Sequence, residues 1–259
     1  MKYYIVDAFA EELFAGNPAG VCILDKWIDD TLLKNIAVEN NLSETVFVVK
    51  NGSNYDLRYF TPDGTEIDLV GHATLASAHI MFSFYEKDAN IINFSTKGGM
   101  LNVKKGTDKY EMDFPAFAIK QVTVSSQMEK TIGVKPVEAW MGRDLVCILE
   151  NEDLVCNAKI DLTEAIKLDG MLLHITAKSQ KYDCVSRTFG PKVGISEDPV
   201  CGTGHCHIVP IWSEKLNKKS IVANQASKRG GTLYCEKNGD RIKLSGKAKL
   251  YLEGEIYTR

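Results

Sequence analysis

Apolar residues recur along the chain in two patterns, which predict many short strands and fewer helices. Six runs rich in β-branched and aromatic residues, separated by Gly, Pro, Asn and Asp, are typical of strands. These predicted strands are residues 3–9, 21–24, 45–49, 56–60, 91–94 and 101–103. Apolar residues recur instead at helical spacing over 30–39 and from Gly71 to Phe82, so these two segments predict helices.

The second half of the chain repeats this style. A predicted strand ends at Phe114-Pro115 and the following residues become polar, which indicates a domain boundary near that proline. A further helix is predicted over 202–217, before a strand-rich end. We therefore expect an α+β fold with two similar halves, 1–115 and 116–259.

Two of the predicted helices begin in similar ways. Val70 precedes Gly71 at the first, and Cys201 precedes Gly202 at the second, with small residues following each glycine. One matched glycine is weak evidence for an internal duplication. Such helix starts present free backbone N–H groups and a partial positive charge, which suit a carboxylate or another anion.

Composition and charge narrow the classes of partner. The chain has 259 residues, of which 44% are apolar and 25% charged, as in a globular protein with one large domain or two modest ones. Lys and Arg number 31 against 34 Asp and Glu, and no basic run is long enough to follow a phosphate backbone. We therefore expect no nucleic acid partner. No stretch approaches 18 consecutive apolar residues, so no membrane partner is expected either.

The cysteines indicate a reducing compartment. There are seven, an odd number, with no regular spacing and no Cys-x-x-Cys pair, in a chain too large to need disulfide staples. We expect reduced thiols in a cytoplasmic protein. The start of the chain agrees, because Asp7 interrupts the first apolar run before it reaches the length of a signal peptide.

Glu44 and His72 are the candidates for acid/base chemistry in the first half. If a strand begins at Glu44, alternation places its side chain on the face of Val46 and Val48, where a carboxyl enters an apolar surface and suits a general acid or base. The alternative is an exposed acid at a strand end. His72 begins a helix, whose dipole favours a neutral ring able to hydrogen-bond a substrate. Otherwise it is an ordinary first-turn residue.

Asp198 and Cys201 are the corresponding candidates in the second half. Asp198 precedes Pro199, so it either orients a substrate or forms a turn. Cys201 at a helix start either has a lowered pKa and a reactive thiolate, or is a buried thiol, which is the commoner case.

The glycines and histidines after Cys201 do not indicate a cofactor. The stretch 202–204 lacks the residues of a P-loop or a dinucleotide fingerprint. His205, Cys206 and His207 point in different directions on a helix, and no second ligand pair at zinc spacing exists. We expect neither a nucleotide nor a metal.

Taken in order, the motifs resemble the PhzF-like isomerase family of phenazine biosynthesis, which is related in fold to the diaminopimelate epimerases. The resemblance covers nearly the whole chain. Its motifs are Val6-Asp7-Ala8-Phe9, Gly16-Asn17-Pro18-Ala19, Asn41-Leu42-Ser43-Glu44-Thr45, Arg58-Tyr59-Phe60-Thr61-Pro62, Asp68-Leu69-Val70-Gly71-His72-Ala73-Thr74, Ser186-Arg187-Thr188-Phe189, Glu197-Asp198-Pro199-Val200 and Gln225-Ala226-Ser227-Lys228-Arg229-Gly230-Gly231.

The resemblance implies two pseudo-symmetric domains, each a mixed sheet rolled around a central helix, with an active site in the cleft between them. It implies an isomerase that moves a proton on a small carboxylate substrate without metal or organic cofactor, and a homodimer. The family's acid/base glutamate falls on Glu44, its histidine on His72 and its aspartate on Asp198. The residues implied to bind substrate are Gly71, Ala73, Cys201, Gly202 and Thr203.

One departure leaves the reaction open. Diaminopimelate epimerases use two cysteines, one before each central helix; Cys201 matches the second, but Val70 occupies the first and cannot carry a proton. A symmetric two-thiol racemase is therefore disfavoured. Three functions remain: an isomerase with Glu44 as general acid/base, an epimerase or racemase that pairs Cys201 with Glu44, and a catalytically silent carboxylate-binding protein.

Overall fold

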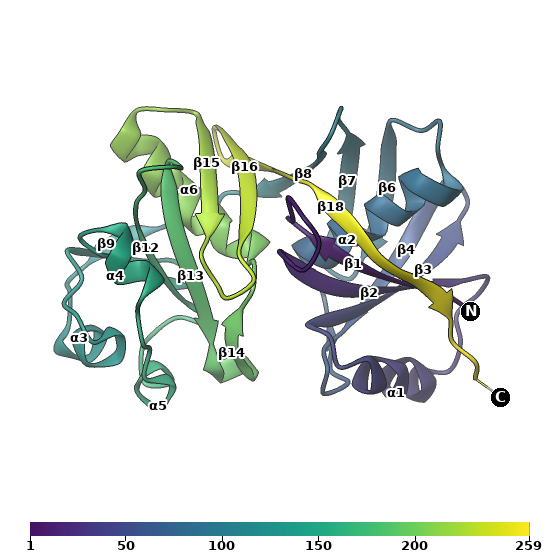
Figure 1. The fold of residues 1–259 in the computed structure, drawn as a ribbon, viewed down its shortest axis with the longest axis horizontal. Helices are drawn as coiled ribbons and strands as arrows, with labels where there is room; N and C mark the ends of the chain where they lie inside the picture. The colour runs from purple at the N-terminus through teal and green to yellow at the C-terminus, as the bar shows by residue number, and fades with distance from the viewer. Residues whose placement is uncertain (259) are drawn as a thin grey trace. The chain divides into compact units, whose positions relative to one another are not determined.

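The computed structural model describes residues 1–258, and the chain divides into two compact units (Figure 1). Among residues 1–258, the first unit comprises residues 1–113 and 245–258, and the second comprises residues 114–244. The division near residue 115 was expected, but the C-terminal segment was expected in the second half. It belongs to the first unit because it pairs with the first strand of the chain.

The first unit is a mixed sheet. Its strands are β1 (Lys2–Ala8), β2 (Asn17–Leu24), β3 (Glu44–Asn51), β4 (Asn54–Phe60), β5 (Glu66–Ile67), β6 (Ile91–Thr96), β7 (Gly99–Lys105), β8 (Tyr110–Pro115) and β18 (Ala248–Glu255). The main strands follow the order β18, β1, β2, β3, β4, β6, β7, β8, with β5 paired to β4. The β2–β3 and β4–β6 pairs are parallel and the others antiparallel.

Helix α2 (Gly71–Ile80) is the buried centre of this unit. All its residues are buried except His79, and it packs against β1, β2, β3 and β18. A helix that is apolar or small all round needs such a surrounding, and this sequence has no polar face to expose. The helix continues into a π-helical turn, Met81–Tyr85. The helix predicted from Gly71 is confirmed.

Helix α1 (Asp30–Asn40) lies outside the sheet of the first unit. The Asp29 side chain caps its start by accepting from the Thr31 backbone N–H, and the helix ends at Asn41, which has a left-handed conformation. Leu33 and Ile36 cover an apolar cluster formed largely by β2 and β3. The helix predicted over 30–39 is confirmed.

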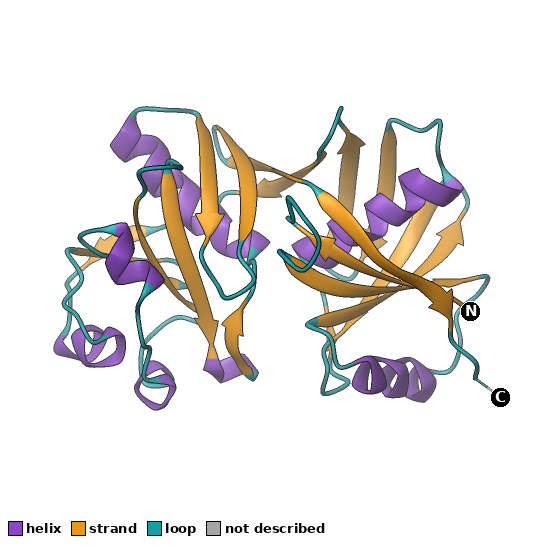
Figure 2. Cartoon of the chain, viewed as in Figure 1, coloured by secondary structure: helices purple, strands orange, loops and turns teal. Residues whose placement is uncertain are grey.

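The second unit is also a mixed sheet around a helix. Its strands are β9 (Lys120–Val122), β10 (Glu138–Met141), β11 (Leu145–Ile148), β12 (Leu173–Lys178), β13 (Cys184–Gly190), β14 (Ile195–Asp198), β15 (Ser220–Gln225) and β16 (Gly231–Asn238), and β17 (Arg241–Gly246) leads back to the first unit. Its helices are α3 (Ser126–Ile132), α4 (Glu152–Cys156), α5 (Leu162–Ala165), the 3-10 turn η2 (Pro191–Val193) and the long, mostly buried α6 (Gly202–Leu216), shown in Figure 2.

The two units share one order of strand pairings. From β1 to β7 the pairs run antiparallel, parallel, antiparallel, parallel, antiparallel, and the same series runs from β10 to β16. In each unit a short strand precedes the central helix, β5 before α2 and β14 before α6. Each unit, taken by itself, is thus the same mixed sheet with a central helix, as the fold resemblance implied.

A local arrangement repeats with the topology. Arg58 binds Glu66 through Nε and Nη2 at 2.7 and 2.8 Å, and Arg187 binds Glu197 through the same atoms at 2.7 and 2.9 Å. Each guanidinium also lies over the phenylalanine two residues later, at 5.3 and 5.1 Å from the ring centre. This repeated arrangement is therefore much stronger evidence for an internal duplication than the match of Gly71 with Gly202.

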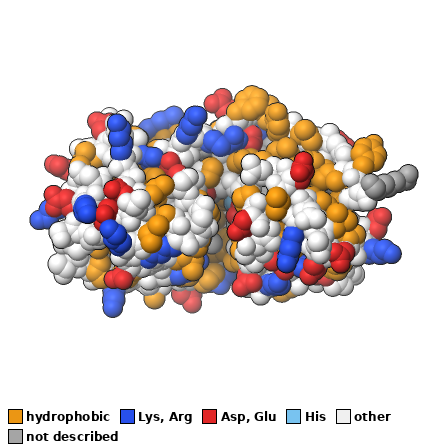
Figure 3. Space-filling model, turned by 90° about the horizontal axis from the view of Figure 1, so that it is seen from below, with side chains coloured by type: hydrophobic (Ala, Val, Ile, Leu, Met, Phe, Trp, Pro, Cys, Tyr) orange, Lys and Arg blue, Asp and Glu red, His pale blue; other side chains and the backbone are white. Residues whose placement is uncertain are grey.

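The surface agrees with the charge balance. On the face drawn in Figure 3, acidic and basic side chains are interspersed, without a broad area of one sign. Among residues 1–258, no helix combines the length and apolar character needed to cross a membrane.

Candidate active site

In the first unit, Glu44 and His72 meet at the start of α2. Glu44 is the first residue of β3, beside Ala19 of the parallel strand β2, and His72 is the second residue of α2. Their exposed fractions are 6% and 5%, and His72 Nε2 lies 2.8 Å from Glu44 Oε2. The predicted burial of Glu44 is confirmed, and the structure brings both predicted residues together.

Asn17 completes this cluster. Its side-chain nitrogen Nδ2 lies 3.2 Å from His72 Nδ1, and both side chains are buried. Because the amide nitrogen can only donate, this bond requires an unprotonated Nδ1, which places the proton of a neutral ring on Nε2, the atom facing Glu44. Asn17 lies in the motif Gly16-Asn17-Pro18-Ala19 of the family resemblance, but the sequence did not predict it as a site residue.

One oxygen of Glu44 is buried without a hydrogen bond. Glu44 Oε2 is within ion-pair distance of His72 Nε2, but no group among residues 1–258 forms a hydrogen bond to it. A buried polar atom that its own protein does not satisfy is unusual and is typical of functional positions. This oxygen is therefore available to accept a proton.

The start of α2 is suited to an anion. Its N-cap residue, Val70, has no side chain that can accept hydrogen bonds from the first turn, whereas most helix starts use Ser, Thr, Asp or Asn there. Gly71 and Ala73, both implied to bind substrate, lie in this turn and are buried. The positive end of the helix dipole lies at the same place.

In the second unit, Cys201 is the N-cap of α6. Its Sγ accepts from the Gly204 backbone N–H at 3.3 Å and lies 3.6 Å from Thr203 Oγ1, while its own N–H donates to Gln225 Oε1 at 2.9 Å. Gln225 in turn donates to the carbonyl of Asp198 at 2.6 Å. The predicted residues Asp198, Cys201 and Thr203 are thus linked in one hydrogen-bonded segment.

The environment of Cys201 differs from the reactive-thiolate alternative. Burial raises the pKa of its thiol well above the usual range, with Asp198 adding to the rise, and these effects exceed the opposite influence of the bonds from Thr203 and Gly204. The helix start alone had suggested a lowered pKa, but the side chain is withdrawn from solvent. Cys201 is a protonated thiol at neutral pH.

Asp198 has the turn role that its position before Pro199 suggested. Its Oδ1 accepts from the Val200 backbone N–H at 3.1 Å, which fixes the chain just before α6. The residue is only partly buried. Its carboxylate therefore positions the start of α6.

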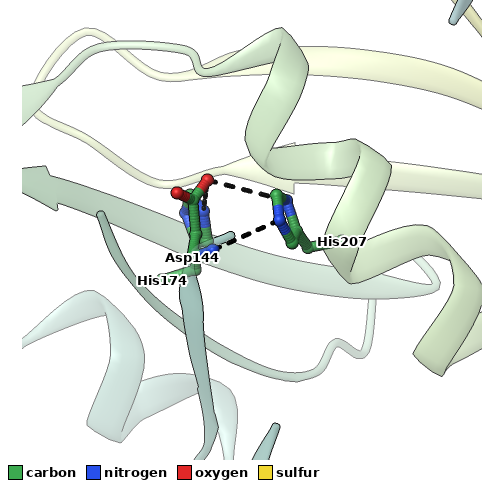
Figure 4. A group of neighbouring side chains, drawn as sticks. All are labelled: Asp144, His174 and His207. Carbon is green, nitrogen blue, oxygen red and sulfur yellow. Dashed lines mark hydrogen bonds and ion pairs between the residues drawn. The ribbon is translucent and has the colours of Figure 1, made fainter. Parts of the chain in front are cut away.

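Three further buried side chains, Asp144, His174 and His207, meet beside α6 in the second unit (Figure 4). His174 Nε2 lies 3.2 Å and His207 Nδ1 lies 3.6 Å from Asp144 Oδ2. All three side chains are fully buried. Burial alone would raise the pKa of Asp144, but the hydrogen bonds of His174 and Arg143 outweigh it and hold that pKa well below its usual range.

The atoms of this group that would face a metal ion already have protein partners. His174 Nε2 contacts Asp144 Oδ2 at 3.2 Å, and His207 Nδ1 lies 3.3 Å from the carbonyl oxygen of Thr203. Arg143 contacts both carboxylate oxygens of Asp144. A metal ion would have to displace the guanidinium and several hydrogen bonds, so we interpret the group as a polar network and not as a metal centre.

The three α6 residues weighed as metal ligands from the sequence, His205, Cys206 and His207, have separate partners. His205 Nδ1 lies 2.7 Å from the Cys201 carbonyl oxygen, and Cys206 Sγ lies 3.9 Å from that of Gly202. His207 lies in the Asp144 group instead. The side chains of these residues therefore point in different directions from α6, as the sequence predicted.

Comparisons with known proteins identify the family. The family model described as "Phenazine biosynthesis-like protein" matches residues 6–254. The chain belongs to the PhzF family of phenazine biosynthesis-like proteins. A Pseudomonas aeruginosa protein named an uncharacterized isomerase is 39% identical over 257 residues, which cover 99% of this chain and 98% of that protein. One from Halalkalibacterium halodurans with the same description is 42% identical, with 98% and 97% of the two chains covered.

Solved structures of PhzF proteins have the same fold. The crystal structure of a PhzF family protein from Enterococcus faecalis has a TM-score of 0.97 at 45% identity, with 99% of both chains covered. A hydroxyproline epimerase from Agrobacterium vitis, 10% identical, has a TM-score of 0.62, with 98% and 91% covered. The second likeness concerns the fold alone, and it confirms the epimerase-like fold that the PhzF resemblance implied.

Proposed function

We propose that this PhzF protein is a cofactor-independent isomerase that moves a proton on a small carboxylate-bearing substrate, with Glu44 as general acid and base. The observation that carries the proposal is the buried Oε2 of Glu44, which accepts no hydrogen bond within residues 1–258 and faces His72 Nε2 at 2.8 Å. The isomerase names of relatives about 40% identical over the whole chain support the reaction class.

In the proposed reaction, Glu44 removes a proton from a carbon that is acidified by an adjacent carboxylate or enamine. The electron pair of the broken C–H bond moves into the neighbouring conjugated group, and the glutamic acid then returns the proton to a different carbon. No oxidant or reductant is needed, because the substrate only exchanges the position of one hydrogen.

The other residues have supporting roles in this proposal. His72, oriented by Asn17, hydrogen-bonds the substrate and keeps its Nε2 at 2.8 Å from Glu44 Oε2. Backbone N–H groups at the helix starts stabilise the negative charge that develops when the proton leaves. In the first unit these are the groups of Gly71 and Ala73 in α2. The second unit, taken by itself, offers groups of the same kind at Gly202 and Thr203 of α6, which Asp198 and Cys201 position.

The test measures the uptake of deuterium from heavy water into a panel of small amino and hydroxy carboxylates. Proton NMR monitors the loss of each C–H signal. Wild type should exchange one C–H of a compound that it binds, and Glu44→Gln should lower this rate by about 10²- to 10⁴-fold with folding intact. Glu39→Gln is the matched control, because it removes an exposed carboxylate from α1 of the same unit. Near-normal exchange by Glu44→Gln would refute the proposal.

The same experiment separates the alternatives. Cys201→Ala should retain most of the exchange, since a protonated buried thiol is a poor base. Loss as large as that of Glu44→Gln would favour the epimerase that pairs both residues. Binding without any exchange by wild type would favour the silent carboxylate-binding protein.

A further inference from the structure

Arg143 has a guanidinium of which one edge is fixed and the other is open. It lies in the turn between β10 and β11. Nε and Nη2 donate to the two oxygens of Asp144, at 3.1 and 2.7 Å. Nη1 has no acceptor among residues 1–258, and the side chain is 36% exposed. The second hydrogen of Nη2 has only the long contact to Thr203 Oγ1, at 3.4 Å, so the outer edge that it forms with Nη1 can meet a ligand.

Arg187 shows how a structural arginine of the same unit differs. It makes the same two-point contact with Glu197, but its Nη1 also donates to the carbonyl of Ala158 at 2.8 Å, with those of Val155 and Cys156 nearby. Each nitrogen of Arg187 thus has a protein acceptor. Arg143 has no such contacts between Nη1 and backbone carbonyls. A purely structural role therefore does not explain why its Nη1 is left open.

A buried chain of side chains fixes Asp144 and, through it, Arg143. His174 contacts Asp144 through Nε2 and Thr188 through Nδ1, at 3.2 and 2.9 Å. Asp144, His174 and Thr188 have no exposed surface. Since rotation of any one of them would leave buried polar atoms unpaired, the guanidinium position is held firmly.

The surroundings place the open edge beside residues already implied to bind substrate. Arg143 Nη2 is 3.4 Å from the Thr203 hydroxyl oxygen, in the first turn of α6, and the guanidinium carbon is 4.7 Å from the centre of the Phe117 ring. Phe117 stacks on His207 with ring centres 4.2 Å apart. The ring covers one surface of the guanidinium, so a ligand is directed to its edge.

We propose that Arg143 is a specificity-determining residue, whose outer edge binds a carboxylate of the substrate beside Thr203. This inference rests on the proposed function for its substrate, but the arginine can be tested without turnover. It selects anionic small molecules over their uncharged amides, because a fixed fork of N–H donors matches a carboxylate in charge and geometry.

The binding test uses malonate as the probe and its neutral amide, malonamide, as the control ligand, titrated into the full chain and followed by NMR. Malonate should shift the Nε–H signal of Arg143, and Arg143→Gln should weaken its binding by about tenfold or more. Lys181→Gln, which removes an exposed cation of the same unit, should leave it unchanged. Failure of malonate to bind wild type, or equal binding by Arg143→Gln, overturns the inference.

Arg143→Lys guards against a folding artefact, since it keeps the charge beside Asp144. We expect it to weaken malonate binding severalfold, because an ammonium group cannot contact Asp144 at two points and still offer a second edge. Binding equal to wild type would contradict the fork geometry.

With any compound that exchanges deuterium, Arg143→Gln should raise KM more than it lowers kcat. If no compound exchanges, the proposed function fails, while the malonate titration still decides the role of Arg143.

Discussion

Single residues determine the chemistry of the candidate site through strand register. Glu44 is buried because it begins β3 beside Ala19 of β2, and Asn17, two residues earlier on β2, orients the ring of His72. The strand pattern predicted the burial of Glu44 from the sequence alone. It could not indicate Asn17, because a Gly-Asn-Pro sequence is equally typical of a turn with no other role.

Gly204 offers a prediction at this scale. A Cβ at this position would lie 2.6 Å from His174 Cε1 and 3.2 Å from Cys201 Sγ. Alanine normally stabilises a helix relative to glycine by up to about 1 kcal/mol, but His174 is held by Asp144 and Thr188 and cannot move freely. Gly204→Ala should therefore lower the free energy of unfolding by about 1–3 kcal/mol, as measured by urea denaturation.

The control for this prediction is Gly254→Ala in β18. Its added Cβ would meet only Leu252 Cδ2, at an ordinary contact distance of 3.6 Å. We expect a change within about 0.5 kcal/mol. If Gly204→Ala proves as stable as this control, His174 is not firmly held, and the positioning of Arg143 through it would be wrong.

At the scale of elements, much of the fold could be predicted and the meeting of distant residues could not. The two central helices follow from runs of apolar and small residues after Gly71 and Gly202. Asp144, His174 and His207 come together only because β11 and β12 pair in parallel and α6 packs beside them, and no local pattern encodes such pairing. The arginine and phenylalanine that recur in β4 and β13 have the same spacing in the sequence, but so short a pattern does not by itself indicate a duplication.

The repeated Arg–Glu pairs should stabilise both units. Each joins a long strand to the short strand before a central helix, and each is partly buried and bound at two points. Glu66→Gln and Glu197→Gln should each lower the free energy of unfolding by about 1 kcal/mol in urea denaturation. Glu255→Gln, which removes a half-exposed partner of Lys2, should have almost no effect; an equal loss in all three would contradict the special role of the paired arginines.

The buried histidines of α6 should make stability depend on pH. Burial lowers the pKa values of His205 and His207 to about 4, whereas an unfolded histidine has a pKa near 6.5. As pH falls from 6.5 toward 4, the unfolded chain takes up protons that the native chain does not, so stability present above pH 6.5 is lost. Between pH 7 and 5 the loss should be on the order of 2 kcal/mol for each histidine.

Urea unfolding at several pH values checks this effect. His205→Gln should reduce the slope of stability against pH in this window, whatever its effect on stability at pH 7. An unchanged slope would mean that His205 is protonated alike in the native and unfolded chains.

For the whole molecule, the main feature that sequence patterns missed is the return of the chain to its first unit. β18 pairs with β1 along its length, and Met1 and Ile256 exchange backbone hydrogen bonds. The local sequence of a C-terminal strand does not predict which strand it pairs with, because here the partner lies more than 200 residues away in the sequence. The contiguous halves expected from the sequence therefore differ from the compact units.

Removal of β18 should weaken the first unit selectively. A chain ending at Lys247 leaves β1 with one neighbouring strand and uncovers part of α2. Amide hydrogen exchange should show loss of protection in β1 and α2, with smaller changes in β12 and β13. A chain ending at Ile256 is the control, and equal protection in the two truncated chains would contradict the assignment of β18 to this unit.

The most direct measurement of the central claim is a crystal structure of the Glu44→Gln variant bound to a compound that wild type deuterates. The side chain of residue 44 should lie about 3–3.5 Å from the carbon that exchanges, the distance of a reacting pair. A structure in which Cys201 or another side chain approaches that carbon, while residue 44 lies out of reach, would contradict the assignment of Glu44 as the acid/base group.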